Sequence, residues 1–309
     1  MELCLRLRAG PPLVLDGATG TELERRGVPS ALPLWSAHAL LAAPEECLRI
    51  HEEYAQAGAV ALTANTFRTQ RRPLARAGLG ERAAELTRTA VELARRAARA
   101  APAGAPVWVL GSAPPLEDCF RPDLVPDAAS LAREHAEHAR NLAAAGVDAI
   151  LAETMNSARE ALAAARAARG VGLPVLVSFV CGPGAALLSG EPLALALARL
   201  APEEPAALLV NCLPPSAVEP CLGPLSASGL PFGVYPNLGA PAPGASGGRS
   251  EELSPEELAR RAESWVRAGA RLVGGCCGTQ PAHIRAIASR LRSRPARSEA
   301  KPGGSSGEG

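Results

Sequence analysis

Eight short apolar runs alternate with longer helix-like stretches along almost the whole of this 309-residue chain. Several runs are continuously apolar, as expected of parallel strands that are covered on both faces. The stretches between them are long enough to hold a helix and to return the chain to the same edge of a sheet. The predicted strands are residues 13–16, 60–64, 107–111, 149–153, 175–180, 208–212, 233–237 and 272–276.

The stretch after the seventh predicted strand contains a clear helix start. Ser254 can cap the first turn, Pro255 suits the first helical position, and Glu257 can complete a capping box. Eight strands that are each followed by a helix predict an α/β fold, a closed (β/α)8 TIM barrel, with an open doubly wound sheet as the main competitor. The even spacing of the eight units favours the barrel, as does the lack of a Gly-x-Gly-x-x-Gly motif after the first strand.

Two segments fall outside this regular pattern. We interpret residues 1–291 as a single barrel domain and residues 292–309, which are rich in Ser, Gly, Pro and charged residues, as a disordered C-terminal tail. Residues 240–248 form a Gly/Pro/Ser-rich loop after the seventh strand. In a barrel this loop would lie at the catalytic end, where it could act as a mobile lid.

Charge and hydropathy exclude several classes of partner. The chain has 32 basic and 31 acidic residues, so it has no overall field that would attract nucleic acid or an acidic membrane. It lacks a run of 18 uninterrupted apolar residues, and its first eight residues are too charged for a signal-peptide core. We therefore expect a cytoplasmic protein with reduced cysteines and small-molecule partners, without nucleic-acid or membrane partners. The sequence is compatible with a homo-oligomer.

Three cysteines stand at the predicted ends of two strands. Cys212 closes the sixth strand, and the adjacent Cys276 and Cys277 end the eighth, between two glycines that allow the backbone to bend. Because the carboxyl ends of barrel strands share one rim, these thiols would supply the three protein ligands of a catalytic zinc site. The open position would accept a substrate thiol and hold it as a nucleophilic thiolate. The adjacent pair alone is equally compatible with small buried residues, and a vicinal disulfide is a third interpretation.

The other cysteines are interpreted as small buried residues, with Cys181, at the end of the fifth strand, left open as an additional site residue. Polar candidates also follow the ends of several strands, and they are Asp16, Gly17, Thr66, Glu153 and Asn211. Glu153 follows a buried run, so it either anchors a substrate ammonium group or is an exposed loop carboxylate. The same two interpretations hold for Asp16, while Gly17 permits close approach of the backbone to a ligand.

In combination these motifs resemble the homocysteine S-methyltransferase family, over residues 13–287. The matching segments are DGATGTEL at 16–23, LWSA at 34–37, TANTF at 63–67, LAET at 151–154, VNC at 210–212 and GGCCGT at 274–279. The GGCCGT block together with the distant Asn-Cys is highly specific.

The resemblance implies that the three cysteines bind Zn²⁺ and that the thiol of homocysteine enters as the fourth ligand. It also implies that Glu153 binds the amino group of homocysteine, while the turn at Asp16 and Gly17 helps to hold its amino-acid portion. Trp35 and Phe67 fall where family members contact the methyl donor, and an aromatic face suits a sulfonium through cation–π attraction. Without the resemblance, ordinary packing would be the favoured interpretation of both aromatic residues.

We therefore predict an enzyme of methionine biosynthesis, a zinc-dependent homocysteine S-methyltransferase that uses S-methylmethionine or S-adenosylmethionine and yields methionine. We predict no catalytic residue beyond the zinc site, since a sulfonium donor leaves as a neutral thioether. One alternative is a methyltransferase that uses betaine, a corrinoid partner, or another thiol or selenol acceptor. Another is a non-catalytic regulator that binds zinc and an amino acid. Residues 238–243 lack the acidic and aromatic residues that the resemblance implies there, which leaves the donor open.

Overall fold

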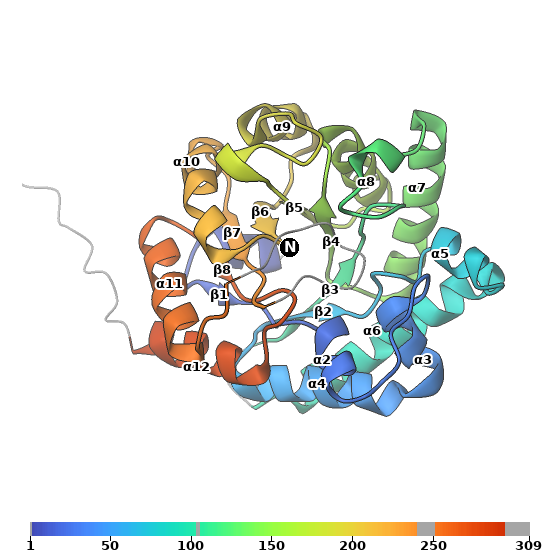
Figure 1. Cartoon of the computed structure of the whole chain (residues 1–309), viewed down its shortest axis with the longest axis horizontal. Helices are drawn as coiled ribbons and strands as arrows, with labels where there is room; N and C mark the ends of the chain where they lie inside the picture. The colour runs from blue at the N-terminus through green and yellow to red at the C-terminus, as the bar shows by residue number, and fades with distance from the viewer. Residues whose placement is uncertain (1, 103–105, 240–250, 294–309) are drawn as a thin grey trace, which may run out of the picture.

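The computed structural model of the chain describes residues 2–102, 106–239 and 251–293. Eight parallel strands form one sheet that curves into a barrel, and helices surround it (Figure 1). The predicted single-domain (β/α)8 barrel is confirmed. The strands are β1 (Leu13–Val14), β2 (Ala61–Ala64), β3 (Trp108–Ser112), β4 (Ala149–Met155), β5 (Val175–Phe179), β6 (Ala207–Asn211), β7 (Phe232–Tyr235) and β8 (Leu272–Val273).

Contacts between the first two strands close the barrel. The order within the sheet is β1-β8-β7-β6-β5-β4-β3-β2, so β1 and β2 stand at its two edges. Just beyond β1, Leu15 forms a parallel bridge with Ala61. The N–H of Val60 donates to the carbonyl of Val14 (2.9 Å), and the N–H of Asp16 donates to that of Ala61 (3.0 Å). Closure places the carboxyl ends of all eight strands around one rim.

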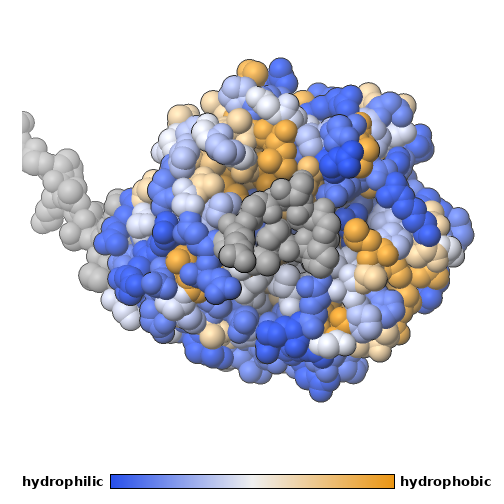
Figure 2. All heavy atoms as spheres, in the orientation of Figure 1, coloured by the Kyte–Doolittle hydropathy of each residue, from blue (hydrophilic) through white to orange (hydrophobic). Residues whose placement is uncertain are grey.

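The surrounding helices bury one side against the strands. In α4, Cys47 and Tyr54 are buried, and the helix ends at Gly58 with a φ of 104°. In α11, Ser254 and Glu257 form the predicted capping box. Figure 2 shows that hydrophilic residues make up most of the outer rim. The helices are α1 (Glu2–Arg8), α2 (Gly20–Arg25), α3 (Ala39–Ala42), α4 (Pro44–Ala57), α5 (Arg71–Arg76), α6 (Ala83–Ala100), α7 (Ala128–Ala145), α8 (Ala158–Gly170), α9 (Leu193–Leu200), α10 (Glu219–Ala227), α11 (Pro255–Arg267) and α12 (Pro281–Arg292).

Alternate residues of each strand face the two sides of the barrel wall. In β4, Ile150 and Ala152 pack against the helices, whereas Ala149 and Leu151 belong to the interior cluster. The same alternation turns Glu153 into the interior. The corresponding interior positions at the carboxyl ends of other strands hold Thr63, Ser112, Ser178, Asn211 and Tyr235. The barrel interior is therefore apolar below and polar at the rim.

Helix α1 seals the opposite end of the barrel. Leu3 and Leu7 are buried in the same interior cluster as Leu13 of β1. The Nε of Arg271, which directly precedes β8, donates to the carbonyl of Leu7 (2.9 Å). In Figure 1 the N-terminus accordingly projects onto the centre of the barrel.

Both β1 and β8 end earlier than the sequence predicted, although hydrogen bonds between the segments that follow them continue beyond the strands. The N–H of Gly275 donates to the carbonyl of Asp16 (3.1 Å), and the N–H of Cys276 donates to that of Pro236 (2.8 Å). The adjacent cysteines are therefore carried by a loop that is fastened to the segments after β1 and β7.

The predicted lid at 240–248 lies outside the described residues, as does nearly all of the predicted tail, whereas Arg292 closes α12. Over the ranges that the structure describes, every helix is too short or too polar to cross a bilayer.

We predict that Leu7→Ala lowers the free energy of unfolding by about 2–4 kcal/mol, because truncating a fully buried leucine leaves a cavity. Leu5→Ala on the same helix is the matched control. Since Leu5 is 63% exposed, its truncation should change that free energy by less than about 0.5 kcal/mol. Urea unfolding monitored by circular dichroism measures both variants, and equal losses would contradict the sealing role of α1.

Candidate metal and substrate site

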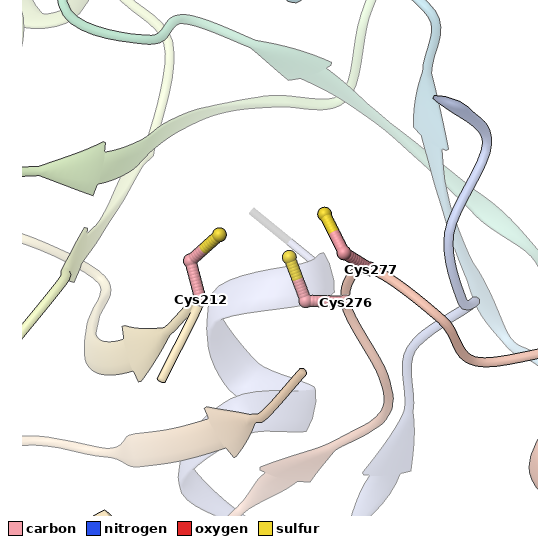
Figure 3. Close-up of side chains that lie close together, drawn as sticks. All are labelled: Cys212, Cys276 and Cys277. Atoms are coloured by element: carbon pink, nitrogen blue, oxygen red, sulfur yellow. The ribbon is translucent and has the colours of Figure 1, made fainter. Parts of the chain in front are cut away.

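Three cysteine sulfurs converge at the rim of the barrel. The Sγ atoms of Cys212, Cys276 and Cys277 all lie within 4.8 Å of one another. Figure 3 shows the three side chains extending from two segments toward a common space. Cys212 and Cys277 are buried, and Cys276 is half-buried. Three close sulfur donors fit the ligand preference of zinc, and thiolates discriminate against magnesium and calcium.

Local backbone geometry holds these thiols in place. Cys212 has a φ of 57°, a left-handed conformation that is uncommon outside glycine. Asn237 joins the two segments, because its Nδ2 donates to the Sγ of Cys212 (3.5 Å) and its Oδ1 accepts from the N–H of Cys277 (3.1 Å). At Gly278 the φ is 80°, and a Cβ there would collide with the carbonyl of Leu238. The turn after the cysteine pair therefore requires glycine.

The three thiols interact through their protons. Hydrogen bonding with Cys212 and Cys276 holds the pKa of Cys277 well below its ordinary value. Hydrogen bonding with Cys276 and Cys277, together with burial, raises the pKa of Cys212. The trio therefore stabilises a thiolate at one sulfur, which is the protonation state that a metal ligand needs, and metal binding would release the remaining protons.

A cavity of about 140 Å³ opens in front of the sulfurs. Five of the predicted substrate residues line it together with the three cysteines, and they are Asp16, Gly17, Trp35, Phe67 and Glu153. Additional residues in its wall, which the sequence did not single out, include Arg68, Ser112, Asp118, Phe120 and Tyr235. Cys119, expected to be a small buried residue, is buried but also borders the cavity.

Two predicted substrate residues lie behind the cavity wall instead. Asn211 is fully buried; its Oδ1 accepts from the Oγ of Ser178 (2.6 Å), and its Nδ2 lies 3.8 Å from the Sγ of Cys276. Thr66 is also fully buried, and its Oγ1 donates to the carbonyl of Ser112 (2.9 Å). Both residues brace the rim, because their polar groups are satisfied by the barrel itself.

Glu153 is a buried carboxyl group without a cationic partner among the described residues. Its Oε1 accepts from the Oγ of Ser112, and its Oε2 accepts from the hydroxyl of Tyr235 (3.3 Å). Burial, reinforced by the nearby Cys276, raises the pKa of Glu153 to about 7. A buried carboxyl group in a cavity wall is suited to bind a cationic group of a ligand.

Asp16 forms a second buried carboxyl group in the same cavity. Its Oδ2 accepts from the N–H of Thr63 (2.7 Å), and its Oδ1 accepts from the Oγ1 of Thr63 (3.1 Å). Burial raises the pKa of Asp16 to about 8. At the adjacent Gly17, a Cβ would lie 2.7 Å from the hydroxyl oxygens of Thr279 and Tyr54, so this turn packs too tightly for a side chain.

Trp35 and Phe67 form an aromatic part of the wall. Their ring centroids are 5.6 Å apart and the ring planes cross at 77°, an edge-to-face arrangement. The indole Nε1 of Trp35 donates to Glu24 (3.1 Å), and a Cβ at Gly20 would overlap the indole ring. Trp35 is therefore fixed by its neighbours in an orientation that exposes aromatic surface to the cavity.

The fold and the site together define a class: a (β/α)8 barrel enzyme with a thiol cluster, able to hold a metal ion, at its catalytic rim. Comparison with known proteins assigns the family. The sequence profile of the homocysteine S-methyltransferase family matches residues 13–291.

Individual relatives agree with this match. Homocysteine S-methyltransferase 1 of Zea mays is 31% identical, with 93% of this chain and 96% of the relative covered. Selenocysteine Se-methyltransferase of Brassica oleracea is 30% identical, with 91% of this chain and 89% of the relative covered. The crystal structure of the homocysteine methyltransferase MmuM from Escherichia coli, in its metallated form, has a TM-score of 0.82 at 32% identity and covers 94% of this chain and 100% of that one. The chain belongs to the homocysteine S-methyltransferase family, and the predicted enzyme class, a thiol methyltransferase, is confirmed.

We predict that the ionisation of Glu153 lowers the free energy of unfolding of the metal-free protein as pH rises through about 7. The folded state raises the pKa of Glu153 from 4.5 to about 7, so it binds the proton more tightly than the unfolded state. The contribution of Glu153 to the free energy of unfolding is complete below the pKa of the unfolded state, 4.5. It is lost as pH rises through the pKa of the folded state, about 7.

When urea unfolding is compared at about pH 5 and about pH 8, the change in the free energy of unfolding should therefore be more favourable in Glu153→Gln than in the wild type, by on the order of 1–3 kcal/mol. Glu92→Gln, which changes an exposed residue of α6, is the control and should respond to pH as the wild type does. Identical pH responses in Glu153→Gln and the wild type would contradict the prediction.

Proposed function

We propose that this protein transfers a methyl group from a sulfonium donor to the thiol of L-homocysteine and releases methionine, with Zn²⁺ held by Cys212, Cys276 and Cys277. The observation that carries the proposal is the convergence of three sulfurs within 4.8 Å of one another, in a cavity that also contains the buried Glu153. Membership of the family supports homocysteine as the acceptor. The metallated form of the Escherichia coli relative supports a metal at this site.

The residues present fit zinc. Three thiolates would leave one tetrahedral position free, and the sulfurs border the cavity, so that position would face a substrate. When bound, zinc would lower the pKa of the homocysteine thiol and keep it as a nucleophilic thiolate at neutral pH.

Glu153 is well placed to bind the ammonium group of homocysteine. The hydroxyl groups of Ser112 and Tyr235 orient its carboxyl oxygens, and its surroundings supply no competing cation in the described chain. With a pKa of about 7 in the free protein, Glu153 can ionise as the ammonium arrives. The buried carboxyl thus distinguishes an amino-acid thiol from a simple alkyl thiol.

Trp35 and Phe67 would bind the methyl donor. Their rings offer the electron-rich faces and the apolar surface that attract a sulfonium cation and exclude water. In the reaction the donor's S–CH₃ bond breaks with its electron pair going to the donor sulfur, while the homocysteine sulfur forms the new bond to carbon. The leaving group is a neutral thioether and needs no proton, so the chain contributes chiefly by aligning the two sulfurs.

A selenol acceptor is the second candidate. The Brassica oleracea relative is named for methyl transfer to selenocysteine. The groups that would bind the amino-acid portion of homocysteine could also bind that of selenocysteine, so the two acceptors differ mainly in the atom that is methylated.

We predict that Cys276→Ala loses zinc and activity together, because two remaining thiols cannot complete the site. Wild-type protein should retain about one zinc per chain, and methionine formation in the variant should fall at least about a hundredfold. Metal analysis and a methionine assay measure the two quantities. Cys221→Ala is the control, since Cys221 is buried in α10 and lies outside the cavity wall. Full activity of Cys276→Ala after metal stripping would refute the mechanism.

We predict that S-methylmethionine or S-adenosylmethionine supports methionine formation from homocysteine and that betaine does not, because a thioether is a better leaving group than a tertiary amine. Glu153→Gln should raise the KM for homocysteine about tenfold or more and leave the KM for the donor nearly unchanged. Initial rates with each donor test both statements. Tight binding of zinc and homocysteine, without methyl transfer from any donor, would instead identify a non-catalytic regulator.

A further inference from the structure

Arg68 places an unpaired positive charge in the wall of the cavity. It follows Phe67 in the loop between β2 and α5. Within the described chain its guanidinium has neither a hydrogen bond nor an ion pair, and its Nε is buried without a partner. Its guanidinium carbon lies 5.5 Å from the ring centroid of Phe67. Burial lowers the pKa of Arg68 and outweighs the opposing effects of its acidic neighbours, so the surroundings compensate its charge only in part. A ligand with an anionic group would do so.

The neighbouring arginines show that carboxylates are available nearby. Arg71, Arg72 and Arg76 of α5 all form ion pairs, with partners that are Glu81, Glu117, Glu134 and Glu137. Arg68 differs from them because it borders the cavity. Its lack of a partner is therefore a property of the cavity rather than a shortage of acidic residues in this region.

The electrostatic neighbours of Arg68 indicate which substrate it faces. The titratable groups that act most strongly on Arg68 are the thiol of Cys119 and the carboxylate of Asp118, in the loop after β3. Glu153, by contrast, is influenced by Cys276 of the thiol trio. The cavity thus has one acidic group at the carboxyl end of β4, beside the candidate metal ligands, and charged side chains on the loops after β2 and β3, where Arg68 lies beside the ring of Phe67. Glu153 suits homocysteine, so the charged side chains beside Phe67 are left for the donor.

Asp118 supplies the opposite charge in this second group. Its Oδ1 accepts from the N–H of Phe120 (2.9 Å), while its Oδ2 has no protein partner in the described ranges. Asp118 and Arg68 line the same cavity, yet they do not form an ion pair with each other in the described structure. Two opposite charges that face one cavity without neutralising each other are complementary to a zwitterion.

We propose that Arg68 binds the carboxylate of the methyl donor and that Asp118 binds its α-ammonium group. The planar guanidinium can form two parallel hydrogen bonds to a carboxylate, which fixes orientation as well as position. A donor held in this way would lay its sulfonium against Phe67 and Trp35, whose rings adjoin each other. The inference rests on the proposed methyl transfer and extends it, because it makes the amino-acid group of the donor a determinant of specificity.

The test compares two donors in zinc-loaded, full-length protein. S-methylmethionine carries the carboxylate and the ammonium group, whereas dimethylpropylsulfonium lacks both. In Arg68→Gln, kcat/KM for S-methylmethionine should fall about a hundredfold, while kcat/KM for dimethylpropylsulfonium and the KM for homocysteine should change less than about twofold. Arg68→Lys keeps the charge but lacks the two parallel N–H donors of the guanidinium, so it should recover only part of the kcat/KM that Arg68→Gln loses.

Two further variants serve as controls. Arg71→Gln removes an exposed, ion-paired arginine from the adjacent helix and should leave all of these constants unchanged. Asp118→Asn should also lower kcat/KM for S-methylmethionine and not for dimethylpropylsulfonium. It tests the same subsite if Arg68→Gln does not fold. Melting temperature and zinc content establish that each variant is intact.

Calorimetric binding of S-methylmethionine, measured without homocysteine so that no methyl transfer occurs, separates this inference from the proposed function. If wild-type protein transfers no methyl group, the proposed function fails, and binding alone decides the role of Arg68. Weaker binding to Arg68→Gln than to wild type, by about a hundredfold, would support the inference in either case. Equal binding to the two proteins, no binding to wild type, or an increase confined to the KM for homocysteine would overturn it.

Discussion

The hydrogen-bonded register of β6, β7 and β8 holds together residues that are far apart in the sequence. Asn211 pairs with Tyr235 across β6 and β7, and Val234 pairs with Val273 across β7 and β8. Cys212 and the segment leading to Cys276 therefore leave the sheet at neighbouring points of one rim. Any slip of a strand by one residue would turn its rim side chain to the other face of the wall and disperse the cluster.

The rim shows how the protein tolerates groups that oppose its own stability. Two carboxyl groups are buried there with raised pKa values, an arginine lies unpaired, and Cys212 adopts a left-handed backbone. Each feature is unfavourable in the isolated chain. Under the proposed function, bound ligands of opposite charge would offset the buried carboxyl groups and the arginine, whereas the rest of the fold must hold the backbone of Cys212. The apolar layers below, sealed by α1, supply the stability that allows these features to persist.

The barrel and the thiol cluster could be predicted because they depend on short patterns. Apolar strands and the capping box at Ser254 are local signals, and the rim position of Cys212 follows from parallel strands. Alternation along β3 and β7 could also have identified Ser112 and Tyr235 as interior residues. Asp118 lies in an irregular loop, and no periodicity marks such a residue. The orientations of Thr66 and Asn211 behind the cavity wall depend on side-chain hydrogen bonds, which sequence spacing does not specify.

The closed floor of the barrel has a kinetic consequence. Because α1 fills the amino-terminal end of the barrel, substrates would reach the thiols through the opposite end, where the strands terminate. If homocysteine binds next to the thiols, as proposed, it would bind before the donor, and methionine would leave after the spent donor. Turnover would then follow a compulsory sequence, in which the spent donor leaves ahead of the newly made amino acid and abundant donor traps that product inside.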